Sequence, residues 1–217
     1  MSLIKFYRAD YSTAGITDAV LQELEAAVGR PLATRIDVAL RSGTRAPEFL
    51  AVNPNGFVPA LVLPDDPAQP LWESAAITMY LGEAYGVDAG LYPAAAAGSR
   101  RAHAVKWIVW SNVNFPLQAR QVSRVVHCQQ EEQDEGVRAL REKDAEVARE
   151  ELRKLLGVLD GGLQDRPYLL GETYSLADTH IWAFMTYIKM LKVDMEGLTN
   201  LTAWIERVGA REQLKGL

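Results

Sequence analysis

Cysteine is nearly absent from this 217-residue sequence, in which Cys128 is the only one. A single cysteine excludes an internal disulfide bond and any Cys-x-x-Cys redox or zinc motif. Its position in the second half of the chain predicts a buried, unreactive thiol. Histidine is scarce as well, and the spacing of His103, His127 and His180 matches no metal-ligand motif. We therefore expect no metal site.

A surplus of positive charge and a long apolar run are also missing. The sequence has 23 Lys and Arg against 28 Asp and Glu, a formal net charge of -5. A nucleic acid or an anionic membrane would depend on a local basic patch, so neither is an expected partner. Apolar runs stay well short of the ~20 residues that span a bilayer, and residues 1–10 lack the apolar core of a signal peptide. The expected location is the cytoplasm.

Hydrophobic residues make up 48% of the sequence, which is enough for a substantial core. Strand and helix patterns alternate in the first 86 residues. The helix expected at 13–29 carries Ile16, Val20 and Leu24 on one face, and because it separates two strands, the crossover rule predicts a parallel β-α-β unit. The expected elements are strands at 3–7, 32–40, 59–64 and 70–72, the last two as a hairpin, and helices at 13–29, 46–53 and 74–86.

Beyond residue 86 the pattern is helical. A connector rich in Gly, Pro and Ala is expected at 87–98. The expected helices cover 99–126 with a kink at Pro116, 131–159, 175–190 and 198–208. Ser175 and Asp178 form a capping box, and the helix that they open is apolar nearly all round, so it should be central. The sequence thus predicts an α/β domain (1–86), a linker (87–98) and an all-helical domain (99–217).

The Val58-Pro59 pair stands directly before an expected strand. An X-Pro bond takes the cis form at a cost of only about 0.5–1 kcal/mol, so the pair can fix a sharp backbone reversal. The N–H and C=O of Val58 would then face solvent and could pair with an extended peptide. The alternative is an ordinary trans proline at the start of a strand.

The Glu73-Ser74 pair opens an expected helix. The free N–H groups and the positive dipole end of a helix favour a carboxylate, and the Ser74 hydroxyl adds a donor. Glu73 could accept hydrogen bonds from an ammonium group. Together they suit the zwitterionic end of an amino acid or a γ-glutamyl group. In the alternative, Ser74 caps its own helix and Glu73 only improves the dipole.

The combination of "NPNGFVPALV", "ESAAITMYL" and "YSLADTHIW" resembles the cytosolic glutathione S-transferase family of bacterial type, over essentially the whole chain. The resemblance implies a thioredoxin-like N-terminal domain, an all-helical C-terminal domain and a homodimer. It implies an enzyme of detoxification that conjugates the thiolate of glutathione to a hydrophobic electrophile, without a metal. Val58 and cis-Pro59 would hold the cysteinyl backbone of glutathione, Glu73 and Ser74 its γ-glutamyl end, and Asn53 would organise the loop before the proline.

Conjugation needs a group that stabilises the thiolate, because a free thiol has a pKa near 8.5. In serine-type members of the family this donor lies near the start of the first helix, where Ser12 matches best. Tyr7 stands where tyrosine-type members place theirs, and Thr13 and Tyr11 are further candidates. Each has a structural alternative: Tyr7 as a core residue, Ser12 or Thr13 as a helix cap. Asp10 would oppose the thiolate unless it points away.

The electrophile pocket is harder to assign. Trp107, Trp110 and Asn114 share one helix side and could line it together with Tyr11, although aromatic residues at helical spacing are more often core. One departure from the family pattern concerns folding: Tyr174 faces the polar Thr179, so the hydrophobic staple of the capping box should be weak. Two alternative functions remain open, a non-catalytic binding or regulatory module, and a glutathione-dependent isomerase, dehalogenase or peroxidase.

Overall fold

The computed structural model describes the backbone of residues 2–128 and 134–216; the side chains of residues 126–128 fall outside this description. The N-terminal part contains a four-stranded sheet in the order β2-β1-β3-β4. Its strands are β1 (Ile4–Arg8), β2 (Ala33–Asp37), β3 (Ala60–Val62) and β4 (Leu71–Trp72). β1 pairs in parallel with β2, whereas β3 pairs antiparallel with both β1 and β4. The predicted β-α-β unit and hairpin are both confirmed.

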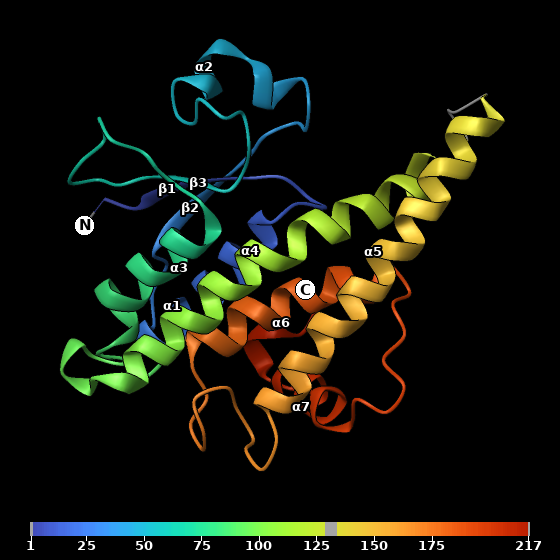
Figure 1. Ribbon diagram of the computed structural model, residues 1–217. Helices are drawn as coiled ribbons and strands as arrows, with labels where there is room; N and C mark the ends of the chain where they lie inside the picture. Colours follow the sequence, from blue (N-terminus) through green and yellow to red (C-terminus); the bar gives the residue numbers. More distant parts are fainter. Residues whose placement is uncertain (1, 129–133, 217) are drawn as a thin grey trace.

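Helices cover the two faces of this sheet. α1 (Ala14–Val28) and α3 (Ser74–Leu81) lie on the side of the helical domain, and α2 (Pro47–Leu50) lies on the other side (Figure 1). α1 ends at Gly29, which adopts a left-handed conformation with φ 73° and donates its N–H to the Glu25 carbonyl. A π-helical turn, Gly82–Gly86, continues α3. The order β-α-β-α-β-β-α is the one that the sequence predicts.

The rest of the chain is helical. α4 (Ser99–Cys128) and α5 (Glu135–Gly162) are two long neighbouring helices, followed by α6 (Leu176–Met190) and α7 (Thr199–Gly209) (Figure 1). The expected start of α5 at residue 131 lies outside the described residues, and Asp134 caps the helix as described. Among the described residues, no helix combines the length and the apolar composition that crossing a membrane requires.

α6 is the central helix, as its all-round apolar pattern predicts. It packs against α1, α3, α4 and α7. The capping box is present: the Asp178 carboxylate accepts hydrogen bonds from the N–H of Ser175 at 3.0 Å and from that of Leu169 at 2.9 Å. Trp204 of α7 donates its indole N–H to the same carboxylate at 2.9 Å. One buried side chain therefore ties the start of α6 to both α7 and the preceding turn.

Candidate active site

A cavity of about 620 Å³ lies between the sheet domain and the helical domain. The β1–α1 loop, the segment 40–45, the loop 53–59 and the start of α3 line it from the first domain, and α4 and α6 from the second. The candidate site residues that line it are Ser12, Thr13, Asn53, Val58, Pro59, Glu73 and Ser74. Residues that are distant in the sequence therefore share one cavity.

The loop before β3 is held by its own side chains. The Val58-Pro59 peptide bond is cis, as predicted. The buried Asn53 donates its Nδ2 to the Phe57 carbonyl at 2.6 Å, and its Oδ1 accepts from the Asn55 N–H at 3.1 Å. Gly56 has a φ of 66°, and a Cβ there would lie 2.8 Å from the Thr44 carbonyl oxygen, so the turn requires glycine.

Only one of the two main-chain groups of Val58 is free within the described residues, whereas both were expected to be. Its N–H has no hydrogen-bond acceptor in the part of the chain that the structure describes. Its carbonyl accepts a hydrogen bond from the Thr13 hydroxyl at 3.2 Å instead of facing solvent free. This bond joins the start of α1 to the proline loop and occupies the acceptor that a bound peptide would use.

The start of α3 has an unusual backbone conformation. Glu73 has φ 75° and ψ 115°, a conformation that a residue with a side chain rarely adopts and that costs of order 1–3 kcal/mol. Neither Glu73 nor Ser74 caps the helix through its side chain, which corrects the capping alternative for Ser74. The N–H groups of Ser74 and Ala75 have no acceptor among the described residues. Free N–H groups at a helix start attract a carboxylate.

A chain of hydrogen bonds connects Ser74 to the helical domain. The Asn112 Nδ2 of α4 lies 3.0 Å from the Ser74 hydroxyl oxygen. The Asn112 Oδ1 lies 2.8 Å from the His180 Nε2 of α6, and the His180 Nδ1 lies 2.8 Å from the Thr78 hydroxyl oxygen of α3. Burial lowers the pKa of His180 to about 3, so the imidazole is neutral.

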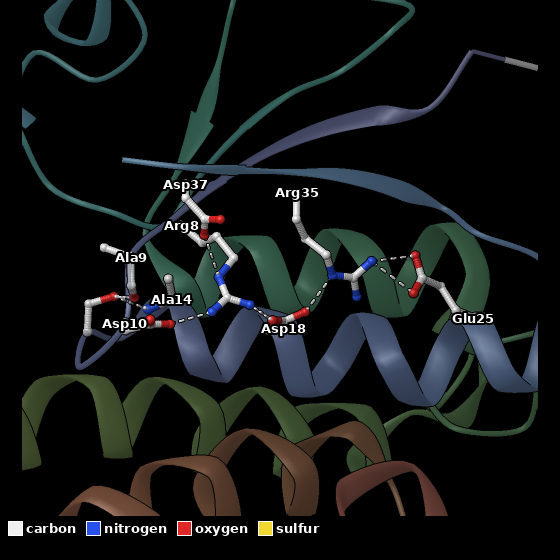
Figure 2. A network of polar contacts seen from close by, with 9 residues as sticks. Arg8, Ala9, Asp10, Ala14, Asp18, Glu25, Arg35 and Asp37 are labelled. Atoms are coloured by element: carbon white, nitrogen blue, oxygen red, sulfur yellow. Dashed lines mark hydrogen bonds and ion pairs between the residues drawn. The ribbon is translucent and has the colours of Figure 1, made fainter. Parts of the chain in front are cut away.

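The β1–α1 loop carries the candidate thiol activators. The Ser12 hydroxyl donates to the Ala9 carbonyl at 2.6 Å and accepts from the N–H of Ala14, the first residue of α1, at 3.2 Å, so it serves the loop and the helix start. The negative charge of Asp10 has a positive partner, because its carboxylate pairs with the Arg8 guanidinium at 2.5 Å (Figure 2). The same guanidinium contacts Asp18 of α1 at 2.5 Å, which fixes the loop to the helix.

A second cavity of about 510 Å³ adjoins the first. It is lined mainly by the β1–α1 loop, α4 and α6, and includes the aromatic rings of Tyr11, Phe184 and Tyr187. Tyr11 is 88% exposed and has a φ of 56°. The residues that line both cavities, and thus mark where they meet, are Ser12, Thr13, Pro116, Arg120 and Phe184.

Four predicted site residues lie elsewhere. Tyr7 lines neither cavity; its ring packs edge-on against Phe49 of α2 with centroids 5.8 Å apart. Trp107 is buried against α5, where a Cβ on Gly162 would lie 2.6 Å from its ring. Trp110 and Asn114 line a separate hollow along α4. Trp107, Trp110 and Asn114 therefore line neither of the two cavities that Ser12 lines.

Sequence reasoning missed several residues that the structure brings to the site. Arg41, Arg45, Asn112 and Arg120 line the first cavity, and no motif marks them. Neither Arg41 nor Arg120 has an ion-pair or hydrogen-bond partner within the described residues. Arg45 donates to the Asn55 carbonyl at 3.1 Å and stacks over Phe57. A useful signal would have been the excess of arginine over acid in the segment 40–46.

Metal chemistry finds no support in the described part of the chain, where no three His, Cys, Asp or Glu side chains come together to hold an ion. The expected buried thiol of Cys128 concerns a side chain outside the described residues.

Comparison with known proteins agrees with this architecture. The family profile "Glutathione S-transferase, N-terminal domain" matches residues 30–84, and "Glutathione S-transferase, C-terminal domain" matches residues 121–212. Glutathione S-transferase GST-4.5 of Xanthomonas campestris pv. campestris is 31% identical over 164 residues, covering 76% of this chain and 75% of that protein. The chain belongs to the glutathione S-transferase family. Family membership places it among glutathione transferase enzymes.

Two further proteins are similar to this glutathione transferase family member. The disulfide-bond oxidoreductase YfcG of Escherichia coli is 28% identical, covering 79% of this chain and 75% of that protein. The solved structure of a glutathione transferase family member from Pseudomonas fluorescens, with two glutathione bound, is 25% identical with a TM-score of 0.77. It covers 98% of this chain and 90% of that chain.

Proposed function

We propose that this enzyme binds reduced glutathione in the 620 Å³ cavity and conjugates its thiolate to a hydrophobic electrophile in the 510 Å³ cavity. One observation carries the proposal: Val58, Glu73 and Thr13 line a single cavity, and Thr13 also lines the second cavity beside it. The glutathione-bound relative from Pseudomonas fluorescens supports it.

The charges of the first cavity suit this tripeptide, which carries two carboxylates and one ammonium group. Glu73 would accept from the ammonium, and the Ser74 hydroxyl with the free N–H groups of α3 would hold the γ-glutamyl carboxylate. Arg41 would hold the glycyl carboxylate at the other end of the cavity. The Val58 N–H and carbonyl would pair with the cysteinyl residue between them as an added strand does.

Thr13 is the better candidate than Ser12 for the donor to sulfur. When the cysteinyl N–H takes the Val58 carbonyl, it displaces the Thr13 hydroxyl, whose 3.2 Å bond uses that same acceptor. The released hydroxyl can then donate to the thiolate. Ser12 has no such exchange, because its bonds to the Ala9 carbonyl and the Ala14 N–H hold the loop to the start of α1. The start of α1 adds the positive end of a helix dipole.

The reaction itself needs little else. The thiol loses its proton to solvent, and the sulfur lone pair forms a bond to the electrophilic carbon. In a substitution the leaving group departs with the bonding pair; in an addition, the new carbanion takes a proton from water. Proximity and thiolate stabilisation would supply the rate gain. We propose that the enzyme works in this way as a cytoplasmic homodimer that detoxifies hydrophobic electrophiles.

A glutathione-dependent disulfide reductase is a second candidate, because one relative is named a disulfide-bond oxidoreductase. There the glutathione thiolate would attack a disulfide sulfur, forming a mixed disulfide and releasing the other half as a thiolate. The reaction needs no protein cysteine, and the β1–α1 loop has none. Isomerisation, dehalogenation and peroxide reduction use the same bound thiolate.

Isothermal calorimetry with reduced glutathione is the first test. We expect saturable binding that Glu73→Gln weakens at least tenfold, whereas Glu48→Gln, an exposed control on α2, leaves it unchanged. A panel of aryl halides, epoxides, hydroperoxides and small disulfides then identifies the reaction. No heat at millimolar glutathione would remove the proposal, and binding without turnover of any substrate would make the protein a binding module.

A further inference from the structure

We propose that Asn112 and His180 are positioning residues that orient the Ser74 hydroxyl, so that its proton points into the cavity toward the γ-glutamyl carboxylate. The inference rests on the proposed glutathione site and adds a specific role for two residues that no motif marks. Neither residue would touch the reacting atoms. They would act through Ser74, in a hydrogen-bond chain that runs from Thr78 through His180 and Asn112 to the Ser74 hydroxyl.

This chain of hydrogen bonds crosses the contact between the two domains. Ser74 and Thr78 lie one turn apart on α3, Asn112 lies on α4, and His180 lies on α6. Ser74, Thr78 and His180 are buried, and every link is 2.8–3.0 Å long. Buried polar groups of this kind are costly unless all of them are satisfied, so the chain has a defined arrangement.

The direction of the chain follows from counting protons. His180 is neutral, so one ring nitrogen donates and the other accepts. The Asn112 oxygen faces Nε2, so Nε2 carries the proton, and Nδ1 accepts from the Thr78 hydroxyl. The Asn112 amide then donates to the Ser74 oxygen at 3.0 Å. The contact from Ser74 back to the Asn112 oxygen is longer, at 3.3 Å, and competes with the His180 donor.

Ser74 is left with one free function. Its oxygen accepts from Asn112, so its own O–H remains available as a donor beside the free N–H groups of α3. The hydroxyl and these N–H groups all donate, which suits a carboxylate and rejects a cation. Because Asn112 fixes the orientation of the Ser74 hydroxyl before the ligand binds, less conformational entropy is lost on binding.

Two substitutions of Asn112 separate orientation from packing. In Asn112→Asp the shape is kept, but the side chain only accepts, so the Ser74 proton turns inward and a negative charge stands near the ligand carboxylate. We expect glutathione affinity to fall about 10- to 100-fold. In Asn112→Ala the Ser74 proton stays free, and we expect a loss of only a few-fold. A packing role predicts the opposite order, because alanine leaves a void.

A ligand pair makes the test specific. The probe is 4-aminobutyryl-cysteinylglycine, which is glutathione without its α-carboxylate, and the readout is its dissociation constant divided by that of glutathione. We expect this ratio to be large in the wild type and to collapse toward one in Ser74→Ala and Asn112→Asp. A general disturbance of the fold would weaken both ligands and leave the ratio unchanged.

Thr78→Val tests the far end of the chain and remains informative if Asn112→Asp does not fold. It removes the donor to His180 with almost no change of shape and lines neither cavity, so the ratio should fall about two- to fivefold. The matched control is Thr17→Val in α1, whose buried hydroxyl has no hydrogen-bond partner within the described residues and which should leave the ratio unchanged.

The outcomes separate the two proposals. A wild type that does not bind glutathione, or a Ser74→Ala variant with an unchanged ratio, would contradict the proposed glutathione site and this inference with it. A normal wild type and a reduced ratio in Ser74→Ala, combined with unchanged ratios in Asn112→Asp and Thr78→Val, would overturn the positioning role alone.

Discussion

The hydroxyl oxygens of Tyr174 and Thr179, the two positions of the expected hydrophobic staple, lie 2.7 Å apart. The predicted weakness of the hydrophobic staple is therefore offset by a polar contact. The Tyr174 hydroxyl also donates to the Glu23 carboxylate of α1 at 2.9 Å. Glu23 in turn receives two hydrogen bonds from Arg211, at 2.6 and 2.7 Å. This buried cluster joins the first domain to the end of the chain.

We expect Tyr174→Phe to lower the free energy of unfolding by about 1–3 kcal/mol, because Thr179 and Glu23 each lose a buried partner. Urea denaturation measures the change. Tyr168→Phe is the matched control, since its ring packs against Tyr174 and its hydroxyl has no hydrogen-bond partner in the described chain. Equal effects of the two substitutions would show that the hydrogen bonds of the Tyr174 hydroxyl contribute nothing to stability.

The roles of Thr13 and Ser12 differ in a way that can be measured. We expect Thr13→Val to raise the pKa of the bound glutathione thiol by about one unit, equivalent to about 1.4 kcal/mol, through loss of the donor to sulfur. Ultraviolet thiolate absorbance across a pH titration reports it. Ser12→Ala should lower the melting temperature and leave the thiol pKa in place. The reverse pattern would return the activating role to Ser12.

Arg120 provides a third prediction. Arg120 lines both cavities and has no ion-pair or hydrogen-bond partner among the residues described. Its positive charge therefore lies where the two cavities meet, which is where we place the glutathione thiolate. We expect Arg120→Gln to raise the bound thiol pKa by roughly half to one unit. Arg124→Gln, one turn along α4 and outside both cavities, is the control. Identical titration curves for the two variants would exclude the role.

The sequence predicts the fold more completely than the site. Strands and helices were predicted to within a few residues because alternating and helical apolar patterns follow directly from which face is buried, as the position of α6 illustrates. The cis bond at Pro59 and the acid at Glu73 were found because each belongs to a local motif. Arg41 and Arg120 belong to none.

The position of Trp107, Trp110 and Asn114 outside the two cavities has a physical cause. The spacing of Trp107, Trp110 and Asn114 correctly indicates a shared side of α4 but does not say what that side faces. The packing of α4 against α5 decides it, and this depends on contacts between distant segments. The hydrogen bonds of His180 were not predicted for the same reason, since they join it to Thr78 and Asn112 on other helices.

His180 also predicts how stability depends on pH. Burial lowers its pKa to about 3, so between pH 6.5 and 3 the unfolded chain binds a proton that the folded protein does not. The contribution of His180 to the free energy of unfolding is therefore fully present above pH 6.5. It declines on acidification by up to about 1.4 kcal/mol per pH unit. In His180→Gln, urea denaturation should give a lower stability at pH 7 but a loss smaller by about 2 kcal/mol between pH 7 and 5. Other titrating groups are common to both proteins and cancel in the comparison. Parallel stability curves would mean that the imidazole becomes protonated in the folded state, and a charged His180 could not accept from the Thr78 hydroxyl.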